Sequence, residues 1–226
     1  MKRNNRPPFF LKDKEFIEPD LPFYYLLASD GLFMVKNFQL YSAAVKIENG
    51  LPWLERNSEK LYLKFPKIPK SIIEKAIGFF YTIYQLYKSE AIFILFYNQK
   101  EKKFKFAIPR QVVEITRFRG TEIGSYFLNY SRIPSPPDYV RVASIHSHGD
   151  MIAFYSWTDE KDSRYDDGLN IVVGNLNLRY PSFYACFMIQ GTKFDLPIED
   201  VIEGYDKPYL PVPERWLKKV KQETLP

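Results

Sequence analysis

The run Ala91–Tyr97 consists of seven consecutive apolar or aromatic residues without a single charge. A strand with one face in solvent alternates polar and apolar side chains, whereas a strand that is covered on both faces is apolar throughout. The run therefore predicts a strand inside a sheet that has a layer of structure on each side. Apolar residues between Ile72 and Tyr87 recur at helical spacing just before it, which predicts that a helix supplies one layer.

Signals of secondary structure continue along the rest of the chain. The helix is predicted over about 71–88, with Ser71 as a candidate N-cap and Glu74 at the third helical position. A long loop with several prolines is expected between 117 and 139. Strands are predicted at 23–27, 32–36, 41–47, 91–97, 103–108, 112–117, 139–146, 169–173 and 183–189.

These elements suggest three parts. Residues 1–69 are interpreted as an N-terminal arm, up to about residue 20, and a β-rich extension, with the boundary in the proline-bearing stretch 66–70. Residues 70–205 are interpreted as one mixed α/β domain, and 206–226 as a C-terminal tail. The expected fold class is therefore α/β, an α+β mixed sheet, with a small β-rich N-terminal extension.

Composition and charge exclude several classes of protein. With 46% hydrophobic and 17% aromatic residues, the chain of 226 residues can bury a core. The net charge of +5 is spread over segments such as 99–103, in which basic residues have acidic neighbours, and this pattern indicates solvated surface rather than a nucleic-acid interface. No stretch has the length of a membrane span, and the basic N-terminus leads into no apolar signal segment, so a cytoplasmic location is expected.

The single cysteine, Cys186, limits the chemistry further. One cysteine excludes an internal disulfide and a cysteine-based zinc knuckle. It also disfavours the zinc deaminases, which need a Cys-x-x-Cys pair. Because Cys186 lies in the apolar run 183–189, we expect it to be a small buried core residue.

The chain has two histidines, and they stand one residue apart, at His146 and His148. In a strand, residues i and i+2 point to the same side, so both imidazoles can face one ion. Asp159 follows at the start of the next expected element and can supply a third ligand. Three protein ligands with a fourth position open are typical of a catalytic zinc ion. The alternative is that the two histidines form a polar patch without a metal.

The spacing His146-x-His148, then Ser156-x-x-Asp159, resembles the motif of the JAMM metalloproteases, also called the MPN or JAB domain family. The run 146–162, HSHGDMIAFYSWTDEKD, is similar to the bacterial branch known as PRTRC system protein A, which also carries an N-terminal extension. The resemblance implies a cytidine-deaminase-like JAB/MPN fold, with zinc held by the two histidines and Asp159.

The family also uses a glutamate at the start of the strand after the first helix, and Glu90 stands at that place. By resemblance, Glu90 moves the proton of the catalytic water, and Ser156 stabilises the oxyanion. Glu114 and Glu122 are rival carboxylates, but neither opens the matching strand. Ser156 can also serve as an N-cap of the helix that is expected near Thr158.

Neighbouring residues have plainer interpretations. Asp150, Glu160 and Asp162 lie off the motif spacing and are expected to be solvated or to support the ligands, with Asp162 able to orient a ligand histidine. Trp157 is expected to pack beside the site, the alternative being a wall for substrate. Gly149 replaces the proline of many family members, which is expected to make this loop freer.

Two classes of function follow from the resemblance. The first is a zinc-dependent peptidase or isopeptidase whose substrate is a protein or peptide, with a ubiquitin-like C-terminal tail as one substrate class. The second is a non-catalytic MPN-type scaffold that acts with operon-encoded partners of a plasmid or mobile-element system. Neither needs a membrane. Bound zinc is the observation that distinguishes the two.

Overall fold

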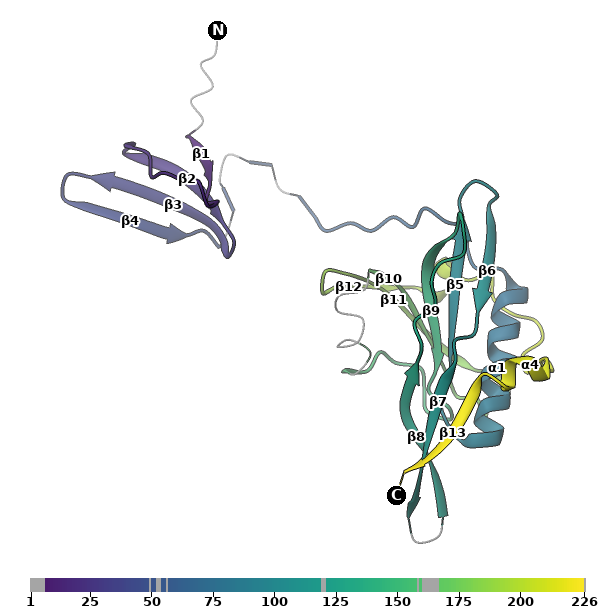
Figure 1. The fold of residues 1–226 in the computed structure, drawn as a ribbon. Coiled ribbons are helices and arrows are strands. Elements are labelled where there is room, and N and C mark those ends of the chain that lie inside the picture. The colour runs from purple at the N-terminus through teal and green to yellow at the C-terminus, as the bar shows by residue number, and fades with distance from the viewer. Residues whose placement is uncertain are drawn as a thin grey trace. The chain divides into compact units, whose positions relative to one another are not determined.

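The structure is a computed structural model (Figure 1) that describes residues 7–225 except 49, 52, 53, 56, 119, 120, 158 and 160–166, with only the backbone for 114–118, 121–128 and 224–225. It divides into two compact units, Met1–Lys60 and Leu61–Pro226, each with its own sheet and core. The division falls inside the extension that is expected at residues 1–69.

The first unit contains a four-stranded sheet with the order β1-β2-β3-β4. Its strands are β1 (Phe9–Leu11), β2 (Phe23–Ala28), β3 (Gly31–Phe38) and β4 (Tyr41–Lys46). β1 is parallel to β2, and the other neighbours are antiparallel. Tyr24, Leu26 and Val35 form its buried core. The three predicted strands are confirmed, but the expected arm is wrong at β1, whose apolar residues pair with β2.

In the second unit, α1 (Lys70–Tyr87) confirms the predicted helix. Its buried side chains recur every three to four residues and therefore share one face. That face comprises Ile72, Ile73, Ala76, Ile77, Phe79, Phe80, Ile83 and Tyr84, and Gly78 is buried on the other side of the helix, next to the Leu210 carbonyl. The helix ends where Lys88 adopts the left-handed conformation and donates its backbone N–H to the carbonyl of Tyr84.

The predicted cap of this helix is wrong. The N-cap is Pro69, and it makes no side-chain hydrogen bond to the first turn. Glu74 instead accepts hydrogen bonds from the backbone nitrogens of Asp206 and Lys207, at 2.9 and 2.8 Å. The carboxylate that was expected to cap the helix locally thus fastens a segment that lies far away in the sequence.

A six-stranded sheet forms the centre of the second unit, in the order β12-β11-β10-β9-β5-β6. Its strands are β5 (Ile92–Asn98), β6 (Lys103–Ala107), β9 (Val140–Ser147), β10 (Gly168–Gly174), β11 (Ser182–Ile189) and β12 (Thr192–Leu196). β9 is parallel to β10, and every other neighbouring pair is antiparallel. β9 therefore has a hydrogen-bonded neighbour on each side.

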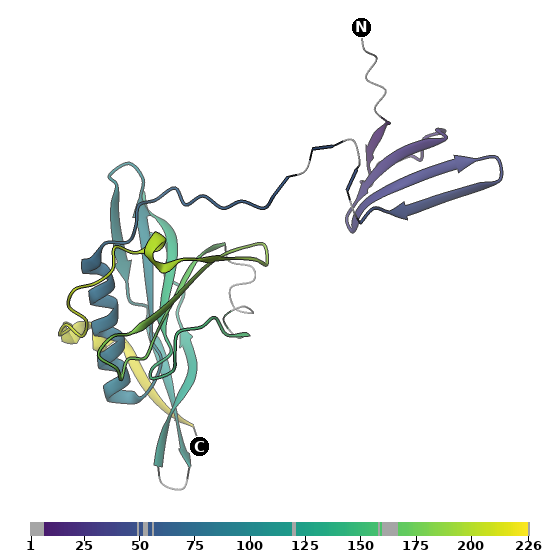
Figure 2. The same ribbon diagram turned by 180° about the vertical axis from the view of Figure 1, so that it is seen from behind.

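Each face of this sheet has its own cluster of apolar side chains. Phe93 and Ile145 belong to the core that contains the buried face of α1, and Figures 1 and 2 show α1 alongside this sheet. Ile92 and Ile94, which alternate with Phe93, belong to a second cluster with Tyr139. All of β5 is buried, which confirms the expectation from its apolar sequence.

A third sheet, with the order β13-β7-β8, completes the described fold. Its strands are β7 (Gln111–Phe118), β8 (Thr121–Tyr130) and β13 (Val220–Leu225). β8 occupies much of the loop that was expected between 117 and 139. β13 pairs in parallel with β7, so the expected tail returns to the domain. Two short helices, α3 (Ile198–Val201) and α4 (Glu214–Leu217), lie between β12 and β13.

The described part of the chain is thus a mixed α+β, strand-rich structure with three sheets and few helices. Trp216 of α4 packs the C-terminal segment against the core. The centroid of its ring lies 5.2 Å from that of Phe106 and 6.4 Å from that of Phe93. Within the described residues, no helix combines the length and the apolar character that crossing a bilayer requires.

Candidate metal centre

The central strand β9 carries the first ligand, His146, and the second, His148, follows one residue after its end. His146 lies opposite Ile92 of β5 and Val172 of β10, so it occupies the middle of the sheet. The backbone nitrogen of His148 donates to the carbonyl of Val173 at 2.9 Å. Both residues are buried, with 9% and 3% of their surface exposed. Backbone pairing therefore fixes the positions from which both imidazoles project.

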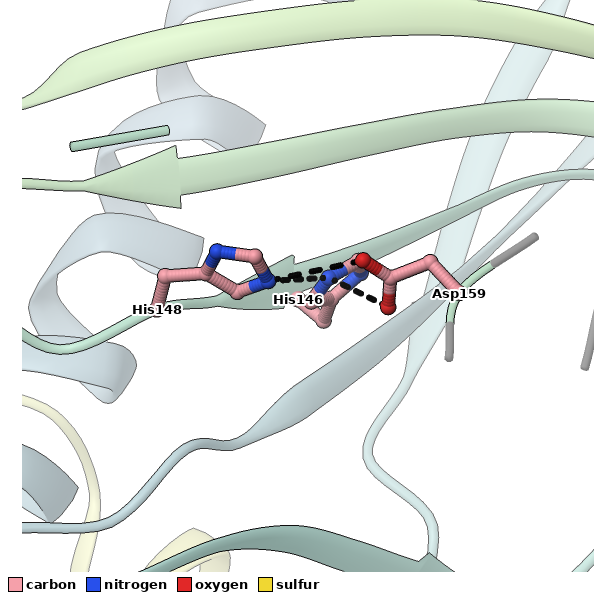
Figure 3. A group of neighbouring side chains, drawn as sticks. All are labelled: His146, His148 and Asp159. Carbon is pink, nitrogen blue, oxygen red and sulfur yellow. Dashed lines mark hydrogen bonds and ion pairs between the residues drawn. The ribbon is translucent and has the colours of Figure 1, made fainter. Parts of the chain in front are cut away.

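Asp159 completes the group, as Figure 3 shows. Its Oδ1 lies 3.2 Å from Nε2 of His146, and its Oδ2 lies 3.5 Å from Nε2 of His148. The two histidine Nε2 atoms are 3.2 Å apart. Among the described residues, these three form the group of histidine, cysteine or acidic side chains whose ligand atoms lie close enough to share an ion.

These separations can be compared with those of a zinc site. Ligand atoms about 2.0–2.1 Å from a zinc ion and at tetrahedral angles lie about 3.3–3.4 Å from one another. The observed separations of 3.2, 3.2 and 3.5 Å are each close to the edge of such a tetrahedron, with Oδ1 of Asp159 facing His146 and Oδ2 facing His148. The residues present fit a zinc ion with one open position, and the predicted metal group is confirmed as one that could hold an ion.

The charge of Asp159 is favoured by its surroundings. Burial opposes its ionisation, but hydrogen bonds with His146 and His148 outweigh this and hold the pKa of Asp159 well below its usual range. A ligand carboxylate has to be ionised to bind a cation. Asp159 is therefore ready to bind a metal throughout the neutral range.

Ser156 and Asp159 form a reciprocal set of hydrogen bonds, the arrangement of a capping box. The hydroxyl of Ser156 donates to Oδ2 of Asp159 at 2.6 Å, and its backbone N–H donates to the same oxygen at 2.8 Å. The backbone N–H of Asp159 donates back to the Ser156 hydroxyl at 3.1 Å. Ser156 thereby orients the ligand carboxylate. Its expected role at an oxyanion stays a prediction, and it would require the one hydroxyl proton to turn away from Asp159.

Glu90 lies between the end of α1 and the start of β5, and it is 9% exposed. Its neighbour Ala91 pairs with Ser147: the Ser147 N–H donates to the Ala91 carbonyl, and the Ala91 N–H donates to the Ser147 hydroxyl, both at 3.0 Å. Continuing this antiparallel register by one residue brings Glu90 opposite His148. Burial and then the negative charge of Asp159 raise the pKa of Glu90 to about 8.

Gln111 is a supporting residue that sequence reasoning missed. It is 1% exposed. Its Oε1 accepts from the Ile92 N–H at 2.9 Å, and its Nε2 donates to the Ile92 carbonyl at 3.2 Å. The side-chain amide thus takes the place of a neighbouring strand beside Ile92, where β6 no longer pairs with β5. It holds the backbone of β5 two residues after Glu90. No local sequence signal marks this role, because it depends on a contact 19 residues away.

The loop after His148 begins at a glycine. Gly149 has a φ of +58°, which a proline cannot adopt. Its carbonyl accepts from the Leu176 N–H at 2.8 Å, and the Met151 carbonyl accepts from the Asn175 N–H at 2.6 Å. Glycine therefore allows a backbone shape that two hydrogen bonds stabilise, and the expectation of a freer loop stays a prediction.

Aromatic side chains border the metal group. The Phe154 ring meets the His148 ring edge to face, with centroids 4.7 Å apart. Trp157 is 75% exposed, so the prediction that it packs beside the site is wrong. Cys186 is fully buried as expected, and burial raises the pKa of its thiol to about 12, which makes it inert.

Several expected residues lie outside what the structure describes. They are Thr158, Glu160 and Asp162, together with the side chains of the rival carboxylates Glu114 and Glu122. Asp162 was expected to orient a ligand histidine. Within the described part of the chain, Nδ1 of His148 is buried without a hydrogen-bond partner. Asp150 is exposed, in keeping with its expectation as a solvated group.

Comparison of the sequence with protein-family models and with curated proteins finds no match. The case for a function therefore depends on the site itself: three converging ligand atoms, a buried glutamate beside them, and a serine that orients the ligand carboxylate.

Proposed function

We propose that this protein is a zinc-dependent hydrolase of peptide or isopeptide bonds, of the JAMM type that its motif resembles. One observation carries the proposal: His146, His148 and Asp159 each offer a ligand atom within 4.8 Å of the others, and their nearest nitrogen and oxygen contacts, at 3.2–3.5 Å, are about the edge of a zinc tetrahedron. Three of the described residues supply ligands, and we propose that the fourth position is left for the reactants.

The mixed sheet supports the same proposal at the level of the fold. The helix α1 precedes β5, and β5 is antiparallel to the ligand-bearing strand β9. This is the order of elements that the proposal requires for Glu90 to enter the site from the start of β5. We accordingly propose a cytidine-deaminase-like JAB/MPN fold for the second unit, with the first unit as an extension of it.

A zinc ion in this site supplies Lewis acidity toward water and toward an amide carbonyl oxygen. Glu90 provides the proton transfer. It accepts a proton from the water that attacks the carbonyl carbon, and it delivers that proton to the amine nitrogen as the carbon–nitrogen bond breaks. Burial and Asp159 raise the pKa of Glu90 to about 8, and a bound cation would lower it by favouring the ionised form, as a base at neutral pH requires.

In this proposal, Ser156 orients the ligand carboxylate, and the histidines act as ligands whose positions the backbone sets. Ser156 holds Oδ2 of Asp159 through two hydrogen bonds. β9 places His146 in the sheet, and the backbone bond to Val173 places His148 just after it. The reaction needs no covalent enzyme intermediate, so Ser156 is not a nucleophile here. We propose a protein or peptide as the substrate, with an extended ubiquitin-like C-terminal tail as the first candidate.

The test is to purify the protein, measure bound zinc, and assay cleavage of a ubiquitin-like fusion and of unstructured peptides with and without a chelator. We expect chelation to stop cleavage and Glu90→Gln to slow it about 100- to 10,000-fold with zinc retained. Glu101→Gln is the matched control, because Glu101 is exposed and follows the other end of β5.

Full activity of Glu90→Gln would contradict the assignment of Glu90. A protein that binds no zinc and ignores the chelator would contradict the metal centre, and it would favour the scaffold function instead.

A further inference from the structure

The segment 149–156 joins His148 to Ser156, so its course determines where Asp159 stands relative to the histidines. Three hydrogen bonds tie it to the ends of β10 and β11. The N–H groups of Asn175 and Leu176 donate to the carbonyls of Met151 and Gly149, at 2.6 and 2.8 Å. The Ala153 N–H donates to the hydroxyl of Ser182 at 2.8 Å.

Gly174, the last residue of β10, lies directly under this segment. A Cβ atom at Gly174 would stand 2.3 Å from the backbone nitrogen of Ala153 and 2.3 Å from the carbonyl oxygen of Met151. Cβ atoms essentially never approach other atoms within 3.0 Å, and these are backbone atoms that cannot rotate away. The segment can run where it does only because residue 174 has no side chain.

Gly174 and Ser182 face one another across the antiparallel pair β10·β11. Directly opposite residues share a face of the sheet, so the missing side chain of one and the hydroxyl of the other meet the segment together. We call these two residues the loop seat. It combines empty space for the backbone with a hydrogen-bond acceptor for Ala153.

We propose that the loop seat positions Asp159 against the two histidines and thereby sets the affinity for the metal ion. The proposal rests on the metal centre of the proposed function. His146 is held by the pairing of β9, which does not involve the segment. His148 is bonded to Val173 and, through its carbonyl, to the Met151 N–H of the segment at 3.1 Å, so His146 is the ligand that stays in place when the segment moves. A side chain at residue 174 would lift the segment and shift Asp159, which opens the triangle of ligand atoms at one corner.

The chain offers two matched controls for Gly174→Ala. Gly168 begins the same strand, and a Cβ there would have the Val142 carbonyl as its nearest neighbour, at 4.0 Å. Gly78 on α1 has a clash of the same size, 2.3 Å from the Leu210 carbonyl, at a helix that supplies no ligand. The first controls for the loss of glycine in β10, and the second for a backbone clash away from the loop.

Zinc affinity is measured by competition with a chromophoric chelator. We expect Gly174→Ala to weaken zinc binding about 10- to 100-fold, as the loss of a support for a ligand does. Gly168→Ala and Gly78→Ala should bind zinc as the parent protein does, although Gly78→Ala is expected to unfold at lower denaturant.

Hydrogen exchange of the metal-free proteins gives a second measurement that needs no activity. In Gly174→Ala, the Ala153 and Asn175 amides should lose protection, while amides within β9 keep theirs. Should Gly174→Ala fail to fold, Ser182→Ala tests the same seat, because it removes only the acceptor. We expect Ser182→Ala to weaken zinc binding about 2- to 10-fold, the worth of one hydrogen bond.

If the parent protein binds zinc and both seat variants bind it equally well, the proposal is overturned and the metal centre stands. If the parent protein binds no zinc, the metal centre and the role of the seat fall together.

Discussion

The backbone N–H of Ser147 donates to the carbonyl of Ala91 over 3.0 Å. Ser147 stands between the two ligand histidines, and Ala91 follows Glu90. This hydrogen bond therefore sets the position of Glu90, the candidate proton-transfer group, relative to the candidate ligands His146 and His148. Because the Ala91 N–H also donates to the Ser147 hydroxyl, the register is fixed at two points.

Asp159→Asn should remove most of the metal affinity. The amide keeps the shape of the side chain but loses the charge that binds a cation. We expect zinc to bind more than about 100-fold more weakly, beyond the effect of losing a supporting residue, as measured by chelator competition. Asp150→Asn, at an exposed neighbour outside the ligand group, should bind zinc normally. An equal loss of zinc affinity in both variants would show that the overall negative charge of this region, and not ligation by Asp159, determines binding.

Ser156→Ala should weaken both the fold and metal binding. It removes the hydroxyl that joins Asp159 Oδ2 to the backbone N–H of Asp159. We expect a stability loss of about 0.5–2 kcal/mol, typical of a lost cap, and zinc affinity lower by about 10- to 100-fold. Ser131→Ala, which removes an exposed hydroxyl bonded to the Arg110 carbonyl, is the control. Unchanged zinc affinity with slow turnover would instead favour the oxyanion role.

The metal-free protein should lose stability as pH rises from about 4.5 to about 8. In this window Glu90 is ionised in the unfolded chain but protonated in the folded one, because its pKa is raised from 4.5 to about 8. The folded state binds more protons, so the free energy of unfolding falls with pH, by at most about 1.4 kcal/mol per pH unit. The lowered pKa of Asp159 acts in the opposite sense: its ionised form stabilises the folded state at neutral pH, and this stabilisation is lost as pH falls below about 4.

Urea unfolding in the presence of a chelator, at several pH values, measures this dependence, and the difference from Glu90→Gln isolates the contribution of Glu90. Parallel curves for the two proteins across this window would contradict the burial of an ionisable Glu90.

Gln111→Leu should destabilise the second unit by about 2 kcal/mol or more. It leaves the N–H and the carbonyl of Ile92 buried without their partner, and each unsatisfied group costs about 1–3 kcal/mol. Gln99→Leu, at an exposed position in the turn after β5, should be nearly neutral. Urea unfolding compares the two, and equal stability would mean that water replaces the amide.

The sequence was sufficient where a local pattern determines the structure. The apolar run of β5, the helical spacing of α1 and the strand spacing of His146 and His148 each depend on residues a few positions apart. The site residues Asp159 and Ser156 followed from motif spacing, and their hydrogen bonds are local too.

Features that depend on segments far apart were missed. β13 pairs with β7 across about half of the chain, and no local pattern marks a parallel pairing of this kind. The predicted helix cap was wrong, because Glu74 accepts a hydrogen bond from the backbone of Asp206 instead of capping the first turn of its own helix. Gln111, Gly174 and Ser182 matter only for what approaches them in space.

The three ligands of the metal group differ in how firmly the backbone holds them. His146 stands on a strand with neighbours on both sides, and His148 follows the end of that strand and is bonded to Val173, whereas Asp159 follows a connecting segment that is bonded to its seat. We therefore expect an ion to enter and leave by movement of the segment that carries the carboxylate, while His146 keeps its place in the sheet. The rate of ion exchange should follow the opening of that segment and not the opening of the sheet.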